Sequence, residues 1–99
     1  MRDREKRMKA SQRIMIQDDD SNYPASIITI SKTGMSVKTK HMFPTYKVVD
    51  VVVKIAKKFI QIKASIRWVN ECSDDKGNKW FEIGLSLPNP PPEYTVNFK

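Results

Sequence analysis

Residues 60–68 alternate between apolar and polar side chains without interruption, and no other segment constrains the fold as strongly. Successive side chains of a β-strand point to opposite faces, so a period of two predicts a strand with one buried and one solvent-facing side. The side expected to be buried carries Ile60, Ile62, Ala64, Ile66 and Trp68. The solvent-facing side carries Gln61, Lys63, Ser65 and Arg67. The pattern therefore predicts a β protein.

Strand signals separated by turn residues recur along the rest of the chain. The further strands expected from them are residues 13–17, 25–30, 35–39, 47–55 and 80–87. The segment 47–55 also fits helical spacing, but its five valines favour a strand, because branching at Cβ restricts χ1 in a helix. Six short antiparallel strands predict an all-β barrel or sandwich, and closure into a small six-stranded β-barrel would remove exposed edges.

The two ends of the chain differ from this strand-forming middle. Residues 1–12 are basic and lack apolar periodicity, so we expect a flexible arm there. Residues 88–99 are rich in proline, which is expected neither to continue a ladder nor to begin a helix here. The predicted organisation is an arm, a barrel domain over residues 13–87, and an extended tail.

The chain carries a formal net charge of +7 and a single cysteine, Cys72. Excess positive charge attracts anions such as a nucleic acid, a nucleotide or an acidic protein surface. The alternative is that lysines at solvent-facing strand positions only keep the protein soluble. No apolar run approaches the roughly 20 residues of a membrane-spanning helix, and the first residues lack a secretory signal. We therefore expect a cytoplasmic protein without membrane insertion.

Residue types that serve catalysis or metal binding are isolated in this sequence. His41 has no second histidine or cysteine at ligand spacing, and Cys72 lies in a turn without a neighbouring base. We therefore expect that the protein is not an enzyme and that it holds no metal ion and no cofactor. Trp68 is expected in the core. Trp80 faces away from Phe81 and is expected at the surface, near the rim or in an interaction patch.

Three segments together carry a resemblance to a known family: ITISKTGMSV at 28–37, IKASIRWVN at 62–70 and WFEIGLSL at 80–87. They resemble the PilZ domain, a family of bacterial receptors for cyclic di-GMP. In the family signature, Asp or Asn is followed by any residue, Ser, two further residues and Gly. Ser31 and Gly34 match this signature, whereas Thr29 occupies the Asp or Asn position.

The resemblance implies a six-stranded barrel that holds cyclic di-GMP at its rim, with the N-terminal arm folding over the ligand. In the family this arm carries two arginines separated by three residues. Here Arg2 is followed four positions later by Lys6, and Arg4 is followed three positions later by Arg7. Arg4 and Arg7 are the first candidates for ligand binding, and Arg2 and Lys6 the next. Arginine suits this role because its planar fork donates to phosphate and to the guanine O6/N7 edge.

Thr29, Ser31 and Gly34 are the candidate ligand-binding residues on the barrel. A threonine hydroxyl accepts a hydrogen bond from guanine but carries no charge, so we expect affinity about ten-fold or more below that of a site with Asp. Ser31 either contacts the ligand or caps the turn locally. Gly34 is expected to permit a positive φ or a close backbone approach.

The function expected first is a cyclic di-GMP-binding signalling module whose arm changes conformation on binding and acts on an unidentified partner protein. The alternative is a divergent PilZ domain that does not bind cyclic di-GMP and serves as a protein-interaction adaptor, in view of Thr29 and the arginine spacing. A small basic barrel that binds single-stranded nucleic acid is a further alternative. It is less favoured because the basic face at 61–67 carries no aromatic side chain.

Overall fold

The structure, a computed structural model, describes residues 8–9 and 12–96. Six strands form the body of the domain: β2 (Arg13–Asp18), β3 (Ser21–Ser31), β4 (Gly34–Thr39), β5 (Val48–Ile55), β6 (Lys58–Ser73) and β7 (Lys79–Ser86). A two-residue strand, β1 (Met8–Lys9), precedes them, and one helical turn, α1 (Pro92–Thr95), follows them. No helix in this described part of the chain has the length and hydrophobicity needed to span a membrane.

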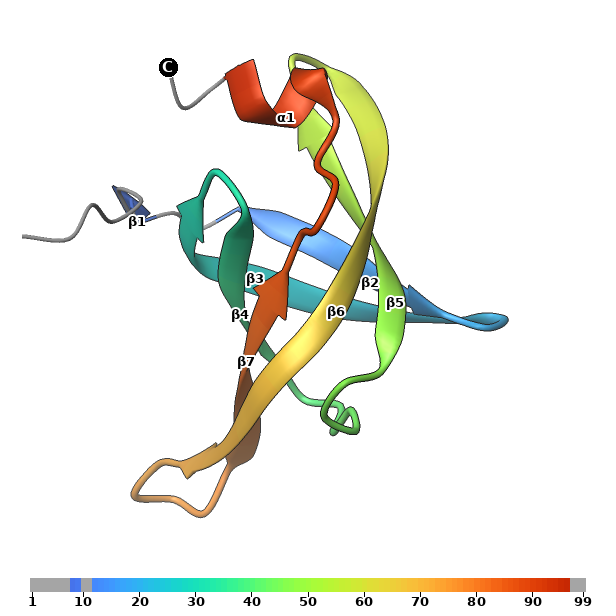
Figure 1. The fold of residues 1–99 in the computed structure, drawn as a ribbon. Coiled ribbons are helices and arrows are strands. Elements are labelled where there is room, and N and C mark those ends of the chain that lie inside the picture. The colour runs from blue at the N-terminus through green and yellow to red at the C-terminus, as the bar shows by residue number, and fades with distance from the viewer. Residues whose placement is uncertain (1–7, 10–11, 97–99) are drawn as a thin grey trace, which may run out of the picture.

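The six strands close into an antiparallel barrel, which confirms the predicted fold class. Around the barrel the strand order is β3, β2, β5, β6, β7 and β4, and β4 pairs again with β3. The long strand β6 crosses the barrel diagonally and pairs with β5 along one part and with β7 along the other (Figure 1). Closure of this kind satisfies strand edges that an open sheet of this size would expose.

The inner face of the barrel carries most of the side chains that the alternation predicted. Ile62, Ala64 and Ile66 of β6 are buried, and so are Ile83 and Leu85 of β7. Their neighbours on β5, the alternate valines of that strand, are buried as well. A period of two along each strand therefore produces a single apolar core inside the barrel.

An aromatic cluster closes one part of this core. Phe43, from the loop between β4 and β5, is buried and meets the ring of Tyr23 edge-on, with 5.3 Å between centroids. His41 stacks on Tyr23 at 3.8 Å and contacts Phe43 at 4.5 Å. His41 thus has a packing role, and the described residues contain no group of three or more potential metal ligands.

The prediction for Trp68 is wrong, because this side chain lies on the outer face with 42% of its surface exposed. The pairing of β6 with β7 shifts between Ile66 and Trp68, which leaves Arg67 as an extra residue. An extra residue of this kind, a β-bulge, reverses the alternation of the strand that contains it. Arg67 and Trp68 therefore both face outward, and Val69 returns to pack against the core.

Both ends of the chain contact the barrel more than expected. Within the predicted arm, β1 pairs with β3 through Met8 and Lys9, which oppose Ile30 and Thr29. The tail was expected to contain no helix, and this is wrong, because Pro92–Thr95 form one helical turn. Proline is tolerated in the first turn of a helix, where its missing N–H would have no partner within the helix.

Candidate functional site

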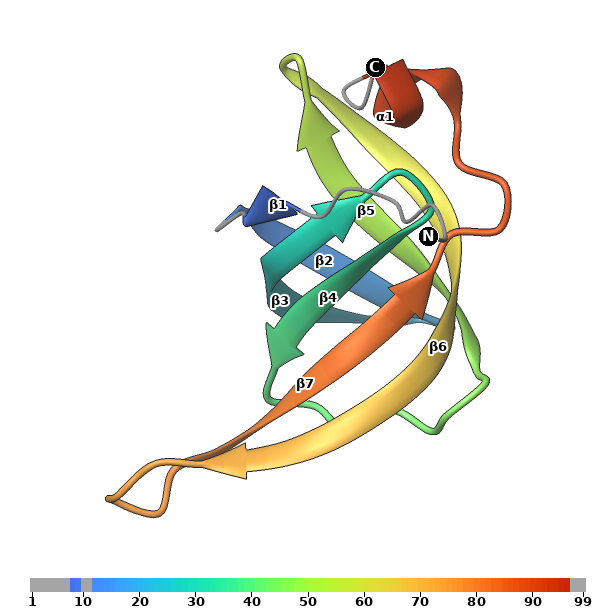
Figure 2. The ribbon, with the colours of Figure 1, turned by 60° about the vertical axis from the view of Figure 1, so that its left-hand side comes forward.

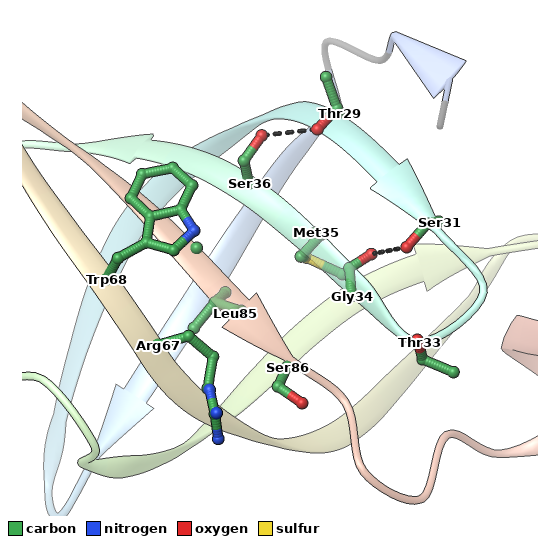
Figure 3. A pocket seen from close by; sticks show the side chains of 11 residues that line it. Thr29, Ser31, Thr33, Gly34, Met35, Ser36, Arg67, Trp68, Leu85 and Ser86 are labelled. Atoms are coloured by element: carbon green, nitrogen blue, oxygen red, sulfur yellow. Dashed lines mark hydrogen bonds between the residues drawn. The ribbon is translucent and has the colours of Figure 1, made fainter. Parts of the chain in front are cut away.

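A pocket of about 640 Å³ lies on the outside of the barrel, where β3, β4, β6 and β7 come together (Figure 3). Its walls combine hydroxyl groups, an indole ring and a guanidinium group. The lining residues are Thr29, Ser31, Thr33, Gly34, Met35, Ser36, Arg67, Trp68, Gly84, Leu85 and Ser86. The three barrel residues predicted from the sequence, Thr29, Ser31 and Gly34, are thus brought together in one pocket.

Two β-bulges direct the side chains of this pocket. The pairing of β3 with β4 shifts between Ile27 and Thr29, as that of β6 with β7 does beside Trp68. Without its bulge, β3 would turn Thr29 to the same side as the buried Ile27. With the bulge, Thr29 lies opposite Ser36 on the outer face, on the same side of the barrel as Trp68.

The hydroxyl groups of Thr29 and Ser36 form a hydrogen bond across the two strands. Their oxygens are 2.7 Å apart, and both residues are half-buried (Figure 3). Either hydroxyl can act as the donor. The pair therefore offers an uncharged mixture of donor and acceptor to a bound molecule, in the place where the family signature has Asp or Asn.

The turn between β3 and β4 is held from inside the protein. Ser31 is 1% exposed, and its hydroxyl donates a hydrogen bond to the carbonyl oxygen of Gly34 at 3.3 Å. The buried Tyr94 hydroxyl, from α1, donates to the carbonyl oxygens of Ser31 at 2.6 Å and of Gly34 at 3.3 Å. The backbone N–H of Leu87 donates to the carbonyl oxygen of Thr33 at 2.8 Å. These contacts fix the position of the turn against the C-terminal segment.

These contacts bear on the roles expected for Ser31 and Gly34. The Ser31 hydroxyl caps its own turn, which is one of the two alternatives drawn from the sequence. Among the glycines of the described residues, positive φ occurs at Gly77 and not at Gly34. The Gly34 carbonyl oxygen accepts a hydrogen bond from the Tyr94 hydroxyl in a buried contact, and a close backbone approach at this glycine stays a prediction.

Trp68 forms the aromatic wall of the pocket, and its position depends on Gly84. Gly84 lies opposite Trp68 in the pairing of β6 with β7. A Cβ atom at position 84 would overlap the indole Nε1 and Cε2 atoms, so the absence of a side chain there makes room for the ring. Glycine inside a strand often marks such a close approach, and this is the sequence signal that points to an outward-facing Trp68.

Among the described residues that line the pocket, Arg67 supplies the one charged side chain. Its side chain is exposed, and its Cζ atom lies 5.8 Å from the ring centroid of Tyr46. Two backbone hydrogen bonds attach the loop that carries Tyr46 to Ile66 of β6. The N–H of Tyr46 donates to the carbonyl oxygen of Ile66 at 2.6 Å, and the N–H of Ile66 donates to the carbonyl oxygen of Lys47 at 2.9 Å. The pocket is therefore positive at this edge and suits an anion.

The basic residues predicted on the arm lie outside the described residues. These are Arg2, Lys6, Arg4 and Arg7. The structure does place the adjoining strand β1 beside the pocket, because Lys9 pairs with Thr29. Arg7 immediately precedes β1 in the sequence.

A closed antiparallel barrel with a polar, cationic and indole-walled pocket on its surface defines a small β-barrel binding domain. The sequence model of the PilZ domain matches residues 1–96. The chain belongs to the PilZ family, as its resemblance predicted.

Solved structures share this fold at low sequence identity. The PilZ domain of YcgR from Escherichia coli, solved with c-di-GMP, has a TM-score of 0.75 and 15% identity, over 99% of this chain and 86% of that one. The PlzA protein of Borreliella burgdorferi in complex with c-di-GMP has a TM-score of 0.77 and 12% identity, over 94% of this chain and 48% of that one. The Bacillus subtilis inhibitor of motility MotI/DgrA has a TM-score of 0.73 and 16% identity, over 99% of this chain and 47% of that one. No curated protein matches the sequence.

Proposed function

We propose that this domain is a signalling module that binds cyclic di-GMP and is not an enzyme. The observation that carries the proposal is the meeting of Thr29, Ser31 and Gly34 with Trp68 and Arg67 in one pocket of a PilZ barrel. Two of the PilZ structures that share the fold were solved with c-di-GMP. The known ligand class of the family thus agrees with the chemistry of the pocket.

The pocket offers a complementary group to each part of such a ligand. The face of Trp68 can stack a guanine, a contact that is worth about 1–3 kcal/mol for a base on an aromatic side chain. The guanidinium of Arg67 can donate to a phosphate, and the Thr29 and Ser36 hydroxyls can exchange hydrogen bonds with a guanine edge. The turn at 31–34, held by the Tyr94 hydroxyl, would present its backbone to the ligand without moving.

The N-terminal segment would supply the remaining positive charge. β1 lies beside Thr29, so Arg7, one residue before it, and Arg4 begin within reach of the pocket. A chain extends by at most about 3.5 Å per residue, which places Arg4 within about 14 Å of β1. Arg2 and Lys6 are the second pair of candidates. Ordering of this segment on the ligand would change the surface that a partner protein meets.

Calorimetry with the purified chain and cyclic di-GMP tests this function. We expect saturable heat, a large loss of affinity for Trp68→Ala, and little change for Trp80→Ala, which removes the other indole at a distance from the pocket. The receptor function would be excluded if no heat were released with ligand up to about 1 mM. A Kd of about 1 mM corresponds to a binding free energy of about −4 kcal/mol.

A second candidate function is that of a PilZ adaptor that has lost the ligand. It is favoured by the Thr29 hydroxyl, which stands where the family signature has a carboxylate or amide and which forms a hydrogen bond with the Ser36 hydroxyl at 2.7 Å. The variant Thr29→Asp distinguishes the two. If it gains binding that the natural chain lacks, the domain is a degenerate receptor, and if the natural chain binds, the adaptor hypothesis is wrong.

A further inference from the structure

A second hollow, of about 570 Å³, lies at the other ends of the same strands that form the pocket around Trp68. It is bounded by β3 and β4 on one side and by the turn between β6 and β7 on the other. The residues that line it are Arg13, Pro24, Ala25, Ser26, Lys38, Thr39, Lys40, Asp74, Asn78, Lys79 and Trp80. None of them lines the pocket around Trp68.

The hollow exists because β4 is shorter than its two neighbours. Thr39, the last residue of β4, pairs with Ala25 and Phe81. Beyond that point β3 and β7 each continue, β3 with β2 and β7 with β6 as partners. The hairpin of β6 and β7 extends away from the barrel past the end of β4 (Figure 2). The pairing of β7 with β4 therefore ends at Phe81, before Trp80 is reached, and this strand edge borders the hollow.

The hollow is strongly positive. Among its lining residues Arg13, Lys38, Lys40 and Lys79 are basic, and Asp74 is acidic. Arg13, Lys38 and Lys40 form no ion pair with another described residue, while Lys79 lies 3.5 Å from Glu71.

The Asp74 carboxylate is engaged in its own turn and does not face these cations as a free partner. It accepts hydrogen bonds from the backbone N–H of Lys76 and from the backbone and side-chain amides of Asn78, each at 2.9 Å. Arg13, Lys38 and Lys40 are thus left for a ligand to neutralise.

Trp80 adds an aromatic surface to this positive site. Its ring is half-buried, and the Lys38 ammonium lies 4.6 Å from the ring centroid. A ring in this setting offers contact to an apolar side chain, while the surrounding cations attract carboxylates. Trp and Arg are enriched among the residues that contribute most to binding at protein interfaces, and charged side chains such as lysines lie mainly at the interface rim.

We propose that this hollow is a docking site for an acidic segment of a partner protein, with an apolar side chain of that segment packed on Trp80. An extended peptide matches both the charge of the hollow and the strand edge beside Trp80. Single-stranded nucleic acid would need several aromatic platforms between the cations, and within the described part of the chain Trp80 is the one aromatic residue that lines the hollow. The inference names the surface used by a partner and is independent of cyclic di-GMP binding.

Fluorescence polarisation with a short labelled peptide of alternating acidic and apolar residues tests this site. The probe is titrated with the full chain, in parallel with an oligothymidylate of equal charge. We expect the double variant Lys38→Glu and Lys40→Glu to weaken peptide binding by about ten-fold or more, since each substitution places like charge against the peptide. Trp80→Ala should also weaken it. The control Lys58→Glu, at the first residue of β6, should change affinity by less than about two-fold.

Amide chemical shifts locate the probe independently of the variants. Peptide binding should move the resonances of residues 38–40 and 79–80 and leave those of residues 31–36 unchanged. Absence of peptide binding, an equal loss with Lys58→Glu, or tighter binding of the oligothymidylate would each overturn the proposal. Calorimetry of the Lys38→Glu and Lys40→Glu variant with cyclic di-GMP should match that of the natural chain, so a failure at this hollow is distinguishable from a failure at the other pocket.

Discussion

The indole ring of Trp68 on β6 occupies the space that a side chain at Gly84 on β7 would fill. Gly84→Ala should therefore displace the ring from its place in the pocket. We expect a loss of stability of about 1–3 kcal/mol, as for other overpacked sites, and a fall in cyclic di-GMP affinity similar to that of Trp68→Ala. Intrinsic fluorescence in a Trp80→Phe background measures the displacement, because Trp68 is then the remaining indole.

Gly77→Ala is the matched control for this substitution. Gly77 has a φ of +83° and nothing within 4 Å of an added Cβ atom, so its cost is backbone strain of about 1 kcal/mol. It should leave the fluorescence of Trp68 and the ligand affinity unchanged. An unchanged Trp68 spectrum in Gly84→Ala would show that the ring does not depend on the glycine.

The same region marks the limit of what the sequence predicted. The alternation at 60–66 placed Ile62, Ala64 and Ile66 correctly, because a half-buried strand requires that period. It failed at Trp68, because a β-bulge is set by the register with the partner strand, and local alternation does not encode that register. The opposed hydroxyls of Thr29 and Ser36 depend on a second bulge and were not foreseen for the same reason.

The proline-rich composition of the tail predicts no helix, and this prediction fails for a different reason. Pro92 occupies the start of α1, where proline is compatible with helical backbone. What fixes this turn is a tertiary contact, the hydrogen bond from the Tyr94 hydroxyl to the Ser31 carbonyl oxygen, which spans most of the domain in sequence. Contacts of such long range are not visible in a local pattern.

Tyr94→Phe should destabilise the domain by removing that hydroxyl. The carbonyl oxygens of Ser31 and Gly34 would lose a buried donor, at a cost of about 1–3 kcal/mol in the free energy of unfolding. Urea denaturation followed by circular dichroism measures the change. Tyr46→Phe is the control, because the side chain of Tyr46 is 71% exposed and its loss of a hydroxyl should have little effect. Equal stability of Tyr94→Phe and the natural chain would contradict this role for α1.

The turn between β6 and β7 should loosen at acidic pH. Hydrogen bonds from the side chain of Asn78 first, and then from its backbone N–H, lower the pKa of Asp74 below the ordinary value of 3.8. A carboxyl group whose pKa is lowered by folding stabilises the folded turn above its unfolded pKa, and this contribution is lost as the pH falls through the folded pKa. The amide resonances of Lys76 and Asn78 report this transition in an acid titration.

Asp74→Asn tests whether this carboxylate is the group that titrates. The variant should abolish the acid transition of the Lys76 and Asn78 amides, whereas Asp75→Asn, in the same turn, should retain it. An acid transition that persists in Asp74→Asn would assign the effect to another group.

Arg67→Gln should weaken cyclic di-GMP binding without weakening the fold, if the proposed function is correct. Arg67 is the charged side chain among the lining residues of the pocket, and a charge-assisted hydrogen bond to phosphate is worth about 1.5–3 kcal/mol, or roughly ten-fold or more in affinity. The melting temperature should change little, because the side chain is exposed and its Cζ atom lies 5.8 Å from the ring centroid of Tyr46.

Lys63→Gln is the control for this charge change. It removes an equal charge from the same face of β6, where Lys63 lies 3.6 Å from Asp50, and should leave affinity for cyclic di-GMP nearly unchanged. Calorimetry at two salt concentrations separates the cases, since the loss of a phosphate contact reduces the salt dependence of binding. Equal affinity for Arg67→Gln and the natural chain would remove Arg67 from the site.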